Sequence, residues 1–540
     1  MTQVRPSDAA DDVALCLNLA FLPPPPAPPP AARFPPLPTM ATLTYTHTAT
    51  QPVQTVLAVA AASNYRYHHQ PASAALLRLP AELVDEILAD LEHADLVALA
   101  LVSKAGAALV IPRHTEYRVI RTRHLLPAMW AHLARRADLA RNIREVHIAE
   151  RSNRKTSDRI PRTLLLAEGS RGGREVLEET RVRNMCEALG HMQRLRTFTW
   201  SWEVSPPTAP MVEPGMENAV LSVLGRKSTL RHLGLAGLFA IHAPGRVADP
   251  ESLGYPLWAF SGLTSLSLRG DAWIKSANAV HVRKVLSQST ELEYLELPLE
   301  LAPTLADLKF PALTRVNLFL NSGGVPRTLD ASAVRFLASH PDLTHLSWTP
   351  CGQVYLSPNA LPSLRALQTS LSVVEMLDCK HLESLDVYGL TPDTLISLAE
   401  NGFSGASLKR VRLEEFGDMD ALRRVAELFP NLTWLALPSR YSGFTLDDWL
   451  DLLPRFRHLE VFRGQALWAA VTLDMTRMHG AIMRLVQMCP RLRELDHCGH
   501  NEARQEWNRI RIVREEGHVR YVIERPPARR WFDAMDGAFD

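Results

Sequence analysis

The stretch 292-LEYLEL-297 decides the fold, because its spacing of apolar residues recurs along most of the chain. Each copy has an apolar residue followed by two more, three and five positions later. On an extended strand the second and third of these residues point to the same side and are buried together. A single copy cannot bury its apolar face alone, so successive copies must stack against one another.

The repeat is irregular in length and covers most of residues 140–500. Copies begin at Leu230, Leu263, Leu292, Leu313, Leu343, Leu382, Leu408 and Leu432, with weaker ones at Ile143, Leu195, Leu364, Leu459 and Leu492. Beyond Leu195 they begin roughly 18 to 35 residues apart, which overlaps the period of about 20 to 29 of leucine-rich repeats. Helix-like stretches at 330–339 and 419–429 separate some copies. This alternation predicts an α/β solenoid with parallel strands on a concave face and helices on a convex face.

A different pattern precedes the repeat, in 76-LLRLPAELVDEILADLEHADLVALALVSKAGAAL-109. Pro80 suits the first turn of a helix, after which Leu83 and Ile87 lie on one face. Asp95 can cap a second helix by accepting a backbone N–H. The stretch therefore predicts two short amphipathic helices.

The order of residues in these helices resembles the F-box. The matching elements are Leu79-Pro80, Glu82-Leu83, Ile87-Leu88, Leu91, Asp95-Leu96, Leu99 and Val102-Ser103-Lys104. Many F-boxes have a tryptophan or another large residue a few positions later, where this chain has Ala105, Gly106 and Ala107. Together with the repeat, the match resembles the F-box/leucine-rich-repeat class of ubiquitin-ligase receptors, whose fungal members often have irregular repeats.

This resemblance implies different roles for the two parts. The helices would dock on the Skp-family adaptor, and through it on the cullin, of an SCF-type cullin-RING ubiquitin ligase, while the solenoid would hold a protein substrate. The residues implied for the docking face or its supporting core are Leu79, Pro80, Leu83, Ile87, Leu88, Leu91, Leu96, Leu99 and Val102. The chain is then a receptor subunit and not an enzyme. The alternative is a leucine-rich-repeat scaffold without a ligase link, in which the helices only cap the array.

Composition divides the chain into four parts. Residues 1–72 are rich in Pro and Ala and predict a disordered tail. Residues 73–118 hold the F-box-like helices, 119–505 the repeat array, and 506–540 a C-terminal hairpin cap with a tail. The hairpin is expected because alternating apolar runs flank a turn at 515–517.

The charge balance narrows the possible partners. The chain has 59 Lys and Arg against 58 Asp and Glu, which disfavours nucleic acid and membrane surfaces as partners. The basic stretch 151–183 predicts a loop inserted between the first two copies. The six cysteines form no CxxC pair, and the N-terminus lacks a signal-peptide pattern, so a cytoplasmic or nuclear location is expected.

Motifs that carry chemistry are missing from the sequence. It contains no GxxxxGK[ST] loop, no HExxH helix and no GxSxG elbow. The best metal-like cluster is Asp496-His497-Cys498-Gly499-His500. Its adjacent residues would point to opposite faces of a strand, whereas zinc needs about four converging ligands. We therefore expect no metal site and no cofactor, and an enzyme built on this cluster is a remote alternative.

Strand alternation predicts the side chains that face the concave surface. Those best suited to bind a partner are Tyr294, Arg315, Phe319, Tyr388, Arg410, Arg412 and Trp434. Tyr, Arg and Trp are the residue types that most often anchor protein interfaces. Three adjacent copies would bring Tyr388, Arg410, Arg412 and Trp434 together as an exposed patch. In the alternative interpretation, Tyr388 and Trp434 pack against neighbouring repeats or the C-terminal tail.

Overall fold

The computed structural model describes residues 79–91, 93–111, 113–115, 117–122, 127–150, 174–202, 216–237, 259–271, 273–274, 276–321, 328–438, 443–471, 475–501, 506–515 and 518–524. All of them belong to one compact unit, which spans residues 76–540. The expected disordered tail of residues 1–72 lies outside the described residues, as does the part 151–173 of the basic stretch.

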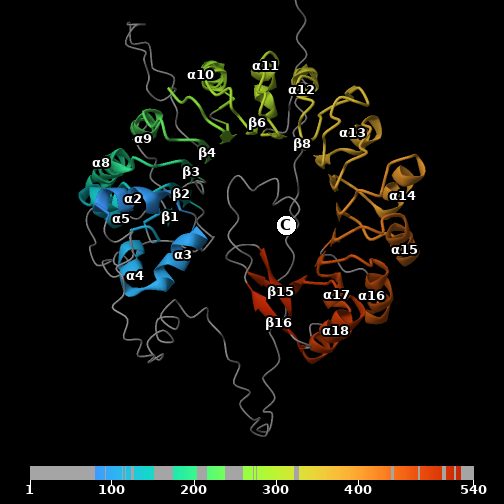
Figure 1. The fold of residues 1–540 in the computed structure, drawn as a ribbon. Coiled ribbons are helices and arrows are strands. Elements are labelled where there is room, and N and C mark those ends of the chain that lie inside the picture. The colour runs from blue at the N-terminus through green and yellow to red at the C-terminus, as the bar shows by residue number, and fades with distance from the viewer. Residues whose placement is uncertain are drawn as a thin grey trace, which may run out of the picture. The chain divides into compact units, whose positions relative to one another are not determined.

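Sixteen strands of the described residues form one sheet, in which each strand pairs with its neighbours in sequence (Figure 1). They are β1 Val119–Thr122, β2 Glu145–Glu150, β3 Thr197–Trp202, β4 His232–Gly237, β5 Ser265–Arg269, β6 Tyr294–Pro298, β7 Arg315–Phe319, β8 His345–Trp348, β9 Ala366–Thr369, β10 Ser384–Val387, β11 Arg410–Arg412, β12 Trp434–Ala436, β13 Val461–Arg463, β14 Glu494–Asn501, β15 Glu506–Glu515 and β16 His518–Glu524. Strands β1 to β14 are parallel, and β15 and β16 are antiparallel to their neighbours. The predicted α/β class with a long parallel sheet is confirmed.

Three of the described helices precede β1, and the others lie between successive strands on one side of the sheet (Figure 1). They are α2 Ala81–Asp90, α3 His93–Val102, α4 Lys104–Val110, α5 Pro127–Arg135, α6 Ala137–Ala140, α8 Arg174–His191, α9 Met216–Gly225, α10 Ser276–Ser287, α11 Ala302–Leu305, α12 Thr328–Ala338, α13 Leu371–Met376, α14 Pro392–Glu400, α15 Met419–Leu428, α16 Leu446–Leu452, α17 Ala466–Ala469 and α18 Met475–Met488, with short 3₁₀ turns at Leu299–Leu301 and Leu453–Arg455. The result is a solenoid-like repeat fold.

The strand register explains how the repeat builds a core. Leu295 pairs with Leu266 on one side and with Val316 on the other, so equal positions of successive copies lie in one row. These side chains are buried in a single core that extends along the array. Each fully buried leucine stabilises the fold by about 1.5–3 kcal/mol relative to an exposed one.

The helices are built from the same kind of local signals. In α15, the Asp418 side chain caps the N-terminus by accepting the Ala421 backbone N–H at 2.6 Å. Leu422 and Val425 are three residues apart, lie on one face and are buried against the core. The helical stretch predicted at 419–429 thus forms as α15.

One prediction about the start of the array is wrong. Residues 174–183 were expected in a basic loop, and they form the first half of α8. Val182, Met185 and Leu189 follow one another at helical spacing and are buried, and α8 packs against α5. The apolar stripe that drives the helix extends past the basic residues.

The described residues before the array form three helices where two were expected. Ser103 ends α3 and caps α4, because its hydroxyl accepts the Gly106 backbone N–H at 2.9 Å. Asp95, predicted as a cap, lies within the first turn of α3. Val84, Leu88, Leu96 and Val110 form a small core between the helices. We call residues 79–111 the three-helix segment.

Candidate interaction surfaces

Large apolar side chains are exposed on one part of the three-helix segment. They are Leu79, Leu83, Ile87, Val97, Leu101 and Val102, with exposed fractions from 39% to 78%. Leu83 and Ile87 lie one turn apart on α2, and Val97 and Leu101 lie one turn apart on α3. We call these six residues the apolar surface. Large apolar side chains exposed together on one short segment favour a protein–protein contact.

The residues predicted to dock the adaptor separate into two groups. Leu79, Pro80, Leu83, Ile87 and Val102 are exposed, whereas Leu88, Leu91, Leu96 and Leu99 are buried or half-buried. The second group packs the core between the helices. Val97 and Leu101 were missed, although their spacing of four residues on a helix could have indicated a shared face.

Gly106 lies in the region where many F-boxes have a tryptophan or another large residue. In this chain the glycine has a packing role. A Cβ atom there would lie 2.5 Å from the Leu99 carbonyl oxygen, well inside contact distance. The glycine therefore allows α4 to approach the end of α3 closely.

Ionic contacts fasten the three-helix segment to the start of the array. The Asp85 carboxylate on α2 lies 2.6 Å from Arg141, 3.7 Å from Arg113 and 3.5 Å from His114. Arg194 donates to the Asp85 backbone carbonyl at 3.3 Å. Burial is the main cause that lowers the pKa of His114, and Asp85 opposes the shift. These contacts hold α2 against the connecting segments that precede β1, β2 and β3.

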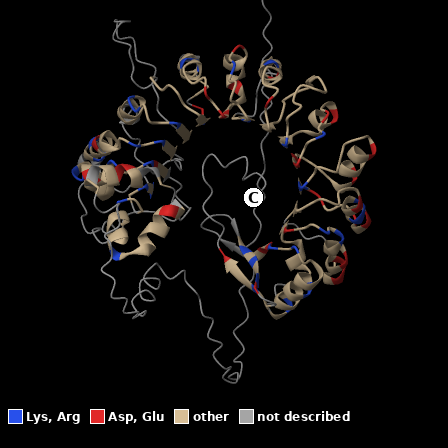
Figure 2. Ribbon diagram, in the orientation of Figure 1, with Lys and Arg blue, Asp and Glu red and all other residues tan. Residues whose placement is uncertain are grey.

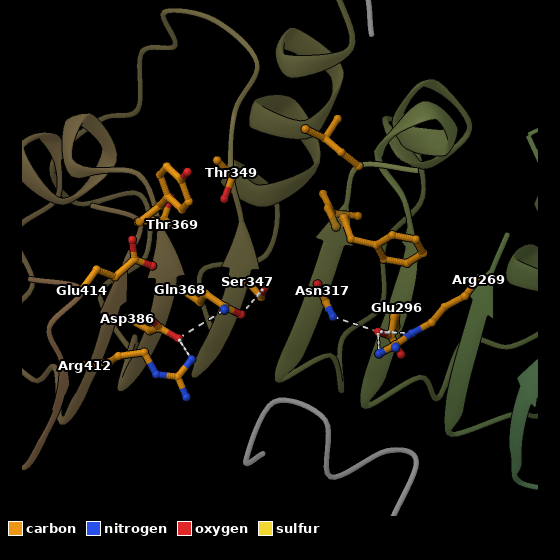
Figure 3. A pocket seen from close by; sticks show the side chains of 14 residues that line it. Arg269, Glu296, Asn317, Ser347, Thr349, Gln368, Thr369, Asp386, Arg412 and Glu414 are labelled. Carbon is orange, nitrogen blue, oxygen red and sulfur yellow. Dashed lines mark hydrogen bonds and ion pairs between the residues drawn. The ribbon is translucent and has the colours of Figure 1, made fainter. Parts of the chain in front are cut away.

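A groove of about 510 Å³ lies on the strand side of the array, opposite the helices (Figure 3). It extends across β5 to β11 and is lined by Arg269, Glu296, Asn317, Leu318, Phe319, Leu320, Ser347, Thr349, Gln368, Thr369, Asp386, Tyr388, Arg412 and Glu414. Most of these residues are polar, and basic and acidic positions are interleaved along the described part of the array (Figure 2). This surface suits a polar or mixed partner more than a purely apolar one.

One end of the groove is organised by Glu296, whose side chain is fully buried. Its carboxylate accepts hydrogen bonds from Ser267 Oγ at 2.5 Å, Tyr294 Oη at 3.1 Å and Asn317 Nδ2 at 2.8 Å. Arg269 donates from Nε at 2.8 Å and also from a terminal nitrogen. A buried carboxylate is stable when it is paired and hydrogen-bonded in this way. Burial, followed by the charge of Glu296, raises the pKa of Tyr294.

The other end of the groove is organised by Asp386. Its Oδ2 atom accepts hydrogen bonds from Arg412 and Gln368 Nε2, both at 3.2 Å. Gln368 Oε1 in turn accepts from Ser347 Oγ at 2.8 Å. Burial raises the pKa of the Asp386 carboxyl, and Arg412 opposes this by favouring the ionised form.

The concave-face residues predicted from the sequence do not form one exposed patch. Tyr388 is 80% exposed, and Arg315, Phe319, Arg410 and Arg412 are half-buried. The prediction of exposed aromatic anchors is wrong for two residues, since Tyr294 and Trp434 are 5% and 4% exposed. The Tyr294 hydroxyl is turned to Glu296.

Trp434 is covered by its own neighbours. It belongs to a small apolar cluster with Ala366, Ala436 and Val461, and the Arg410 guanidinium lies 5.3 Å from its ring centroid. Of the predicted residues, Phe319, Tyr388 and Arg412 line the groove together. Arg410 and Trp434 lie beside it on β11 and β12.

The polar floor of the groove was the part that sequence reasoning missed. Ser347 and Gln368 were not chosen, although both occupy the central strand position of their copies, between two buried residues. That shared position was the available signal. The hydrogen bonds that join these residues depend on strand pairing and are visible only in the folded array.

Asp496, the acidic residue of the metal-like sequence 496–500, has a structural role. Asp496 accepts the Gly464 backbone N–H at 3.0 Å and lies 3.5 Å from Arg463, which also binds Glu494 at 2.6 Å. The side chains of residues 498–500 lie outside the described set. Among the side chains that are described, no group of three or more His, Cys, Asp or Glu residues could hold a metal ion.

No described helix has the length and apolar character needed to cross a membrane.

Comparisons with known proteins give a limited match. No family model and no curated protein matches the sequence. Among solved structures, a chain from the crystal structure of the yeast Rad7 and Elc1 complex is 17% identical to this chain. That match covers 52% of this chain and 72% of the other, with a TM-score of 0.34. At this TM-score the match carries no conclusion about function.

Proposed function

We propose that this chain recruits a protein substrate to an SCF-type cullin-RING ubiquitin ligase. The three-helix segment is an F-box that binds a Skp-family adaptor, and the array is a leucine-rich-repeat solenoid that binds the substrate. The chain is a receptor subunit of the cytoplasm or nucleus and performs no catalysis itself.

The apolar surface of α2 and α3 is the observation that carries the proposal. Six large apolar residues exposed on so short a segment are costly in water unless a partner covers them. Four of them, Leu79, Leu83, Ile87 and Val102, belong to the residue pattern that resembles the F-box. The groove on the array gives a separate surface for the second partner.

A scaffold without a ligase link is the second candidate, and Asp85 favours it. The contacts of Asp85 with Arg141 and His114 fasten α2 to the first repeats, as a dedicated cap would be fastened. A cap and an adaptor-binding segment differ in one respect: a cap needs no partner for its exposed face.

Capture of a purified Skp-family adaptor by the full chain tests the proposal. We expect binding, and we expect the Leu83→Asp/Ile87→Asp variant to lose at least ten-fold in affinity, because the adaptor would have to bury two carboxylates. Both residues are about half exposed, so the variant should keep the thermal unfolding of the parent. Val280→Asp is the matched control, since Val280 is 68% exposed on α10 of the array. If the intact chain binds no such adaptor, the scaffold function is correct.

A further inference from the structure

Polar side chains form one row at matched positions of seven successive strands, and all of them except the buried Ser267 line the groove. From β5 to β11 these residues are Ser267, Glu296, Asn317, Ser347, Gln368, Asp386 and Arg412. Side-chain hydrogen bonds join five of the six neighbouring pairs, and the pair Asn317 and Ser347 is not joined. Figure 3 shows the two joined groups and the gap between Asn317 and Ser347.

The buried carboxylates fix the direction of the hydrogen bonds in each group. An ionised carboxylate only accepts, so Asn317 must turn its NH₂ group toward Glu296 and its carbonyl oxygen elsewhere. In the other group, Gln368 turns its NH₂ toward Asp386 and its oxygen toward Ser347. The Ser347 hydroxyl then donates its proton to Gln368 and keeps only acceptor capacity.

In Figure 3 the Asn317 oxygen lies on the side of its amide group away from Glu296, and the Ser347 hydroxyl on the next strand offers acceptor capacity across the gap. Asn317 and Ser347 are direct register partners on β7 and β8, yet no hydrogen bond joins them within the described part of the chain. Two acceptors cannot satisfy each other, whereas a donor between them could bond to both. Both side chains are half-buried and line the groove, so a bound molecule can reach them.

We propose that this gap receives the ammonium group of a lysine side chain from the bound protein. The inference rests on the proposed function of the array and names the chemistry of its partner. An ammonium has three donors and no acceptor, which matches the oxygens of Asn317 and Ser347. Three carboxylates line the groove, on Glu296, Asp386 and Glu414, against two guanidiniums, so the electrostatics also favour a cation.

Apolar groups at the edge of the groove complete the match. Phe319 is the last residue of β7, the strand that holds Asn317, and Leu320 follows it. Leu320 is 45% exposed. A lysine side chain can pack its four methylene groups along such a surface while its ammonium reaches a polar site. The groove thereby distinguishes lysine from a short cation or a free ammonium ion.

Degenerate peptide pools test the inference with the full chain. Each nine-residue pool has one fixed central residue, which is lysine, arginine, asparagine, Nε-acetyllysine or norleucine, and retention on the immobilised protein is measured. We expect the lysine pool to be retained about ten-fold more than the norleucine pool, which keeps the stem without the charge. The Asn317→Ala/Ser347→Ala variant should lose this preference. Thr199→Ala is the control, since Thr199 occupies the same row on β3, outside the groove.

The remaining outcomes separate this inference from the proposed function. Equal retention of the lysine and norleucine pools overturns the lysine site, and so does retention of none of the pools. A preference for asparagine or arginine overturns the assignment to lysine and names another donor. An unaltered preference in the alanine variant, with unchanged thermal unfolding, places the site elsewhere and also overturns the inference. Adaptor capture by the same preparation decides the ligase link independently of all these results.

Discussion

The three-helix segment and the repeat array differ in how they treat their apolar residues. The segment buries four apolar residues completely or nearly so and exposes seven large ones, five of which lie on α2 and α3. In the array, each repeat covers the apolar side of the next, and one core extends from Tyr117 to Ile512. Stacking removes apolar surface from water without a partner, whereas a short helical segment has too little interior to do so. The segment therefore has more exposed large apolar side chains for its size than the array.

The largest changes in stability should come from truncating buried side chains in the core of the array or in the core of the three-helix segment. Each change should affect only the region whose core is altered. Trp449 is fully buried, with ring centroids of Phe416, Phe444 and Phe462 between 5.7 and 6.3 Å away. Trp449→Ala should lower the free energy of unfolding of the array by about 3–5 kcal/mol, measured by urea denaturation. Leu88→Ala should cost about 2–5 kcal/mol within the three-helix segment and abolish adaptor capture, with no change in the array transition.

A single transition that shifts equally in both variants would contradict this separation, because it would mean that the two cores unfold together.

Replacement of glycine by alanine should change the free energy of unfolding in opposite directions at Gly106 and Gly480. Gly106→Ala places a Cβ atom 2.5 Å from the Leu99 carbonyl oxygen and should destabilise the three-helix segment by about 1–3 kcal/mol. Gly480 is exposed within α18, and a Cβ atom there meets nothing within 4 Å. Gly480→Ala should therefore stabilise the array by about 0.5–1 kcal/mol, since alanine loses less backbone entropy in a helix. Thermal unfolding of both variants measures the two changes in stability. Destabilisation by Gly480→Ala would refute the prediction for Gly480.

The smallest effect concerns the contact between the two regions. Asp85→Ala removes the carboxylate that binds Arg141 and His114, and should cost about 1 kcal/mol. Amide hydrogen exchange in α2 should then rise about five-fold, while exchange in the array stays unchanged. Asp138→Ala is the control, because Asp138 pairs with Arg136 within the array. Equal exchange in parent and variant would show that α2 is held by its apolar contacts alone.

Several features of the array could be predicted because they depend on local spacing. Leu295 and Leu297 are buried together because residues two apart on a strand point to the same face of the sheet, and the same holds for Leu385 and Val387. The start of α15 at Met419 follows from the capping residue Asp418. The third helix α4 was missed, because its signal is a single capping serine in a run of small residues.

The groove could be predicted less well, since its properties arise between strands. Trp434 faces the expected side of the sheet, yet its exposure is set by Ala366, Val461 and Arg410, which come from other repeats. The gap between Asn317 and Ser347 depends on two carboxylates that lie on β6 and β10. A spacing pattern contains no information about which side chains become neighbours across a sheet.

The sequence by itself determined the α/β class, the repeated strands and the presence of the helices α2 and α3, because hydrophobic periodicity acts within a few residues and survives any change of neighbours. The tertiary structure alone decided which apolar side chains of α2 and α3 stay exposed, which aromatic residues of the array are covered, and where hydrogen-bond acceptors meet without a donor. Those outcomes depend on register and packing between residues that are tens of positions apart, and only stacking of the repeats brings such residues into contact.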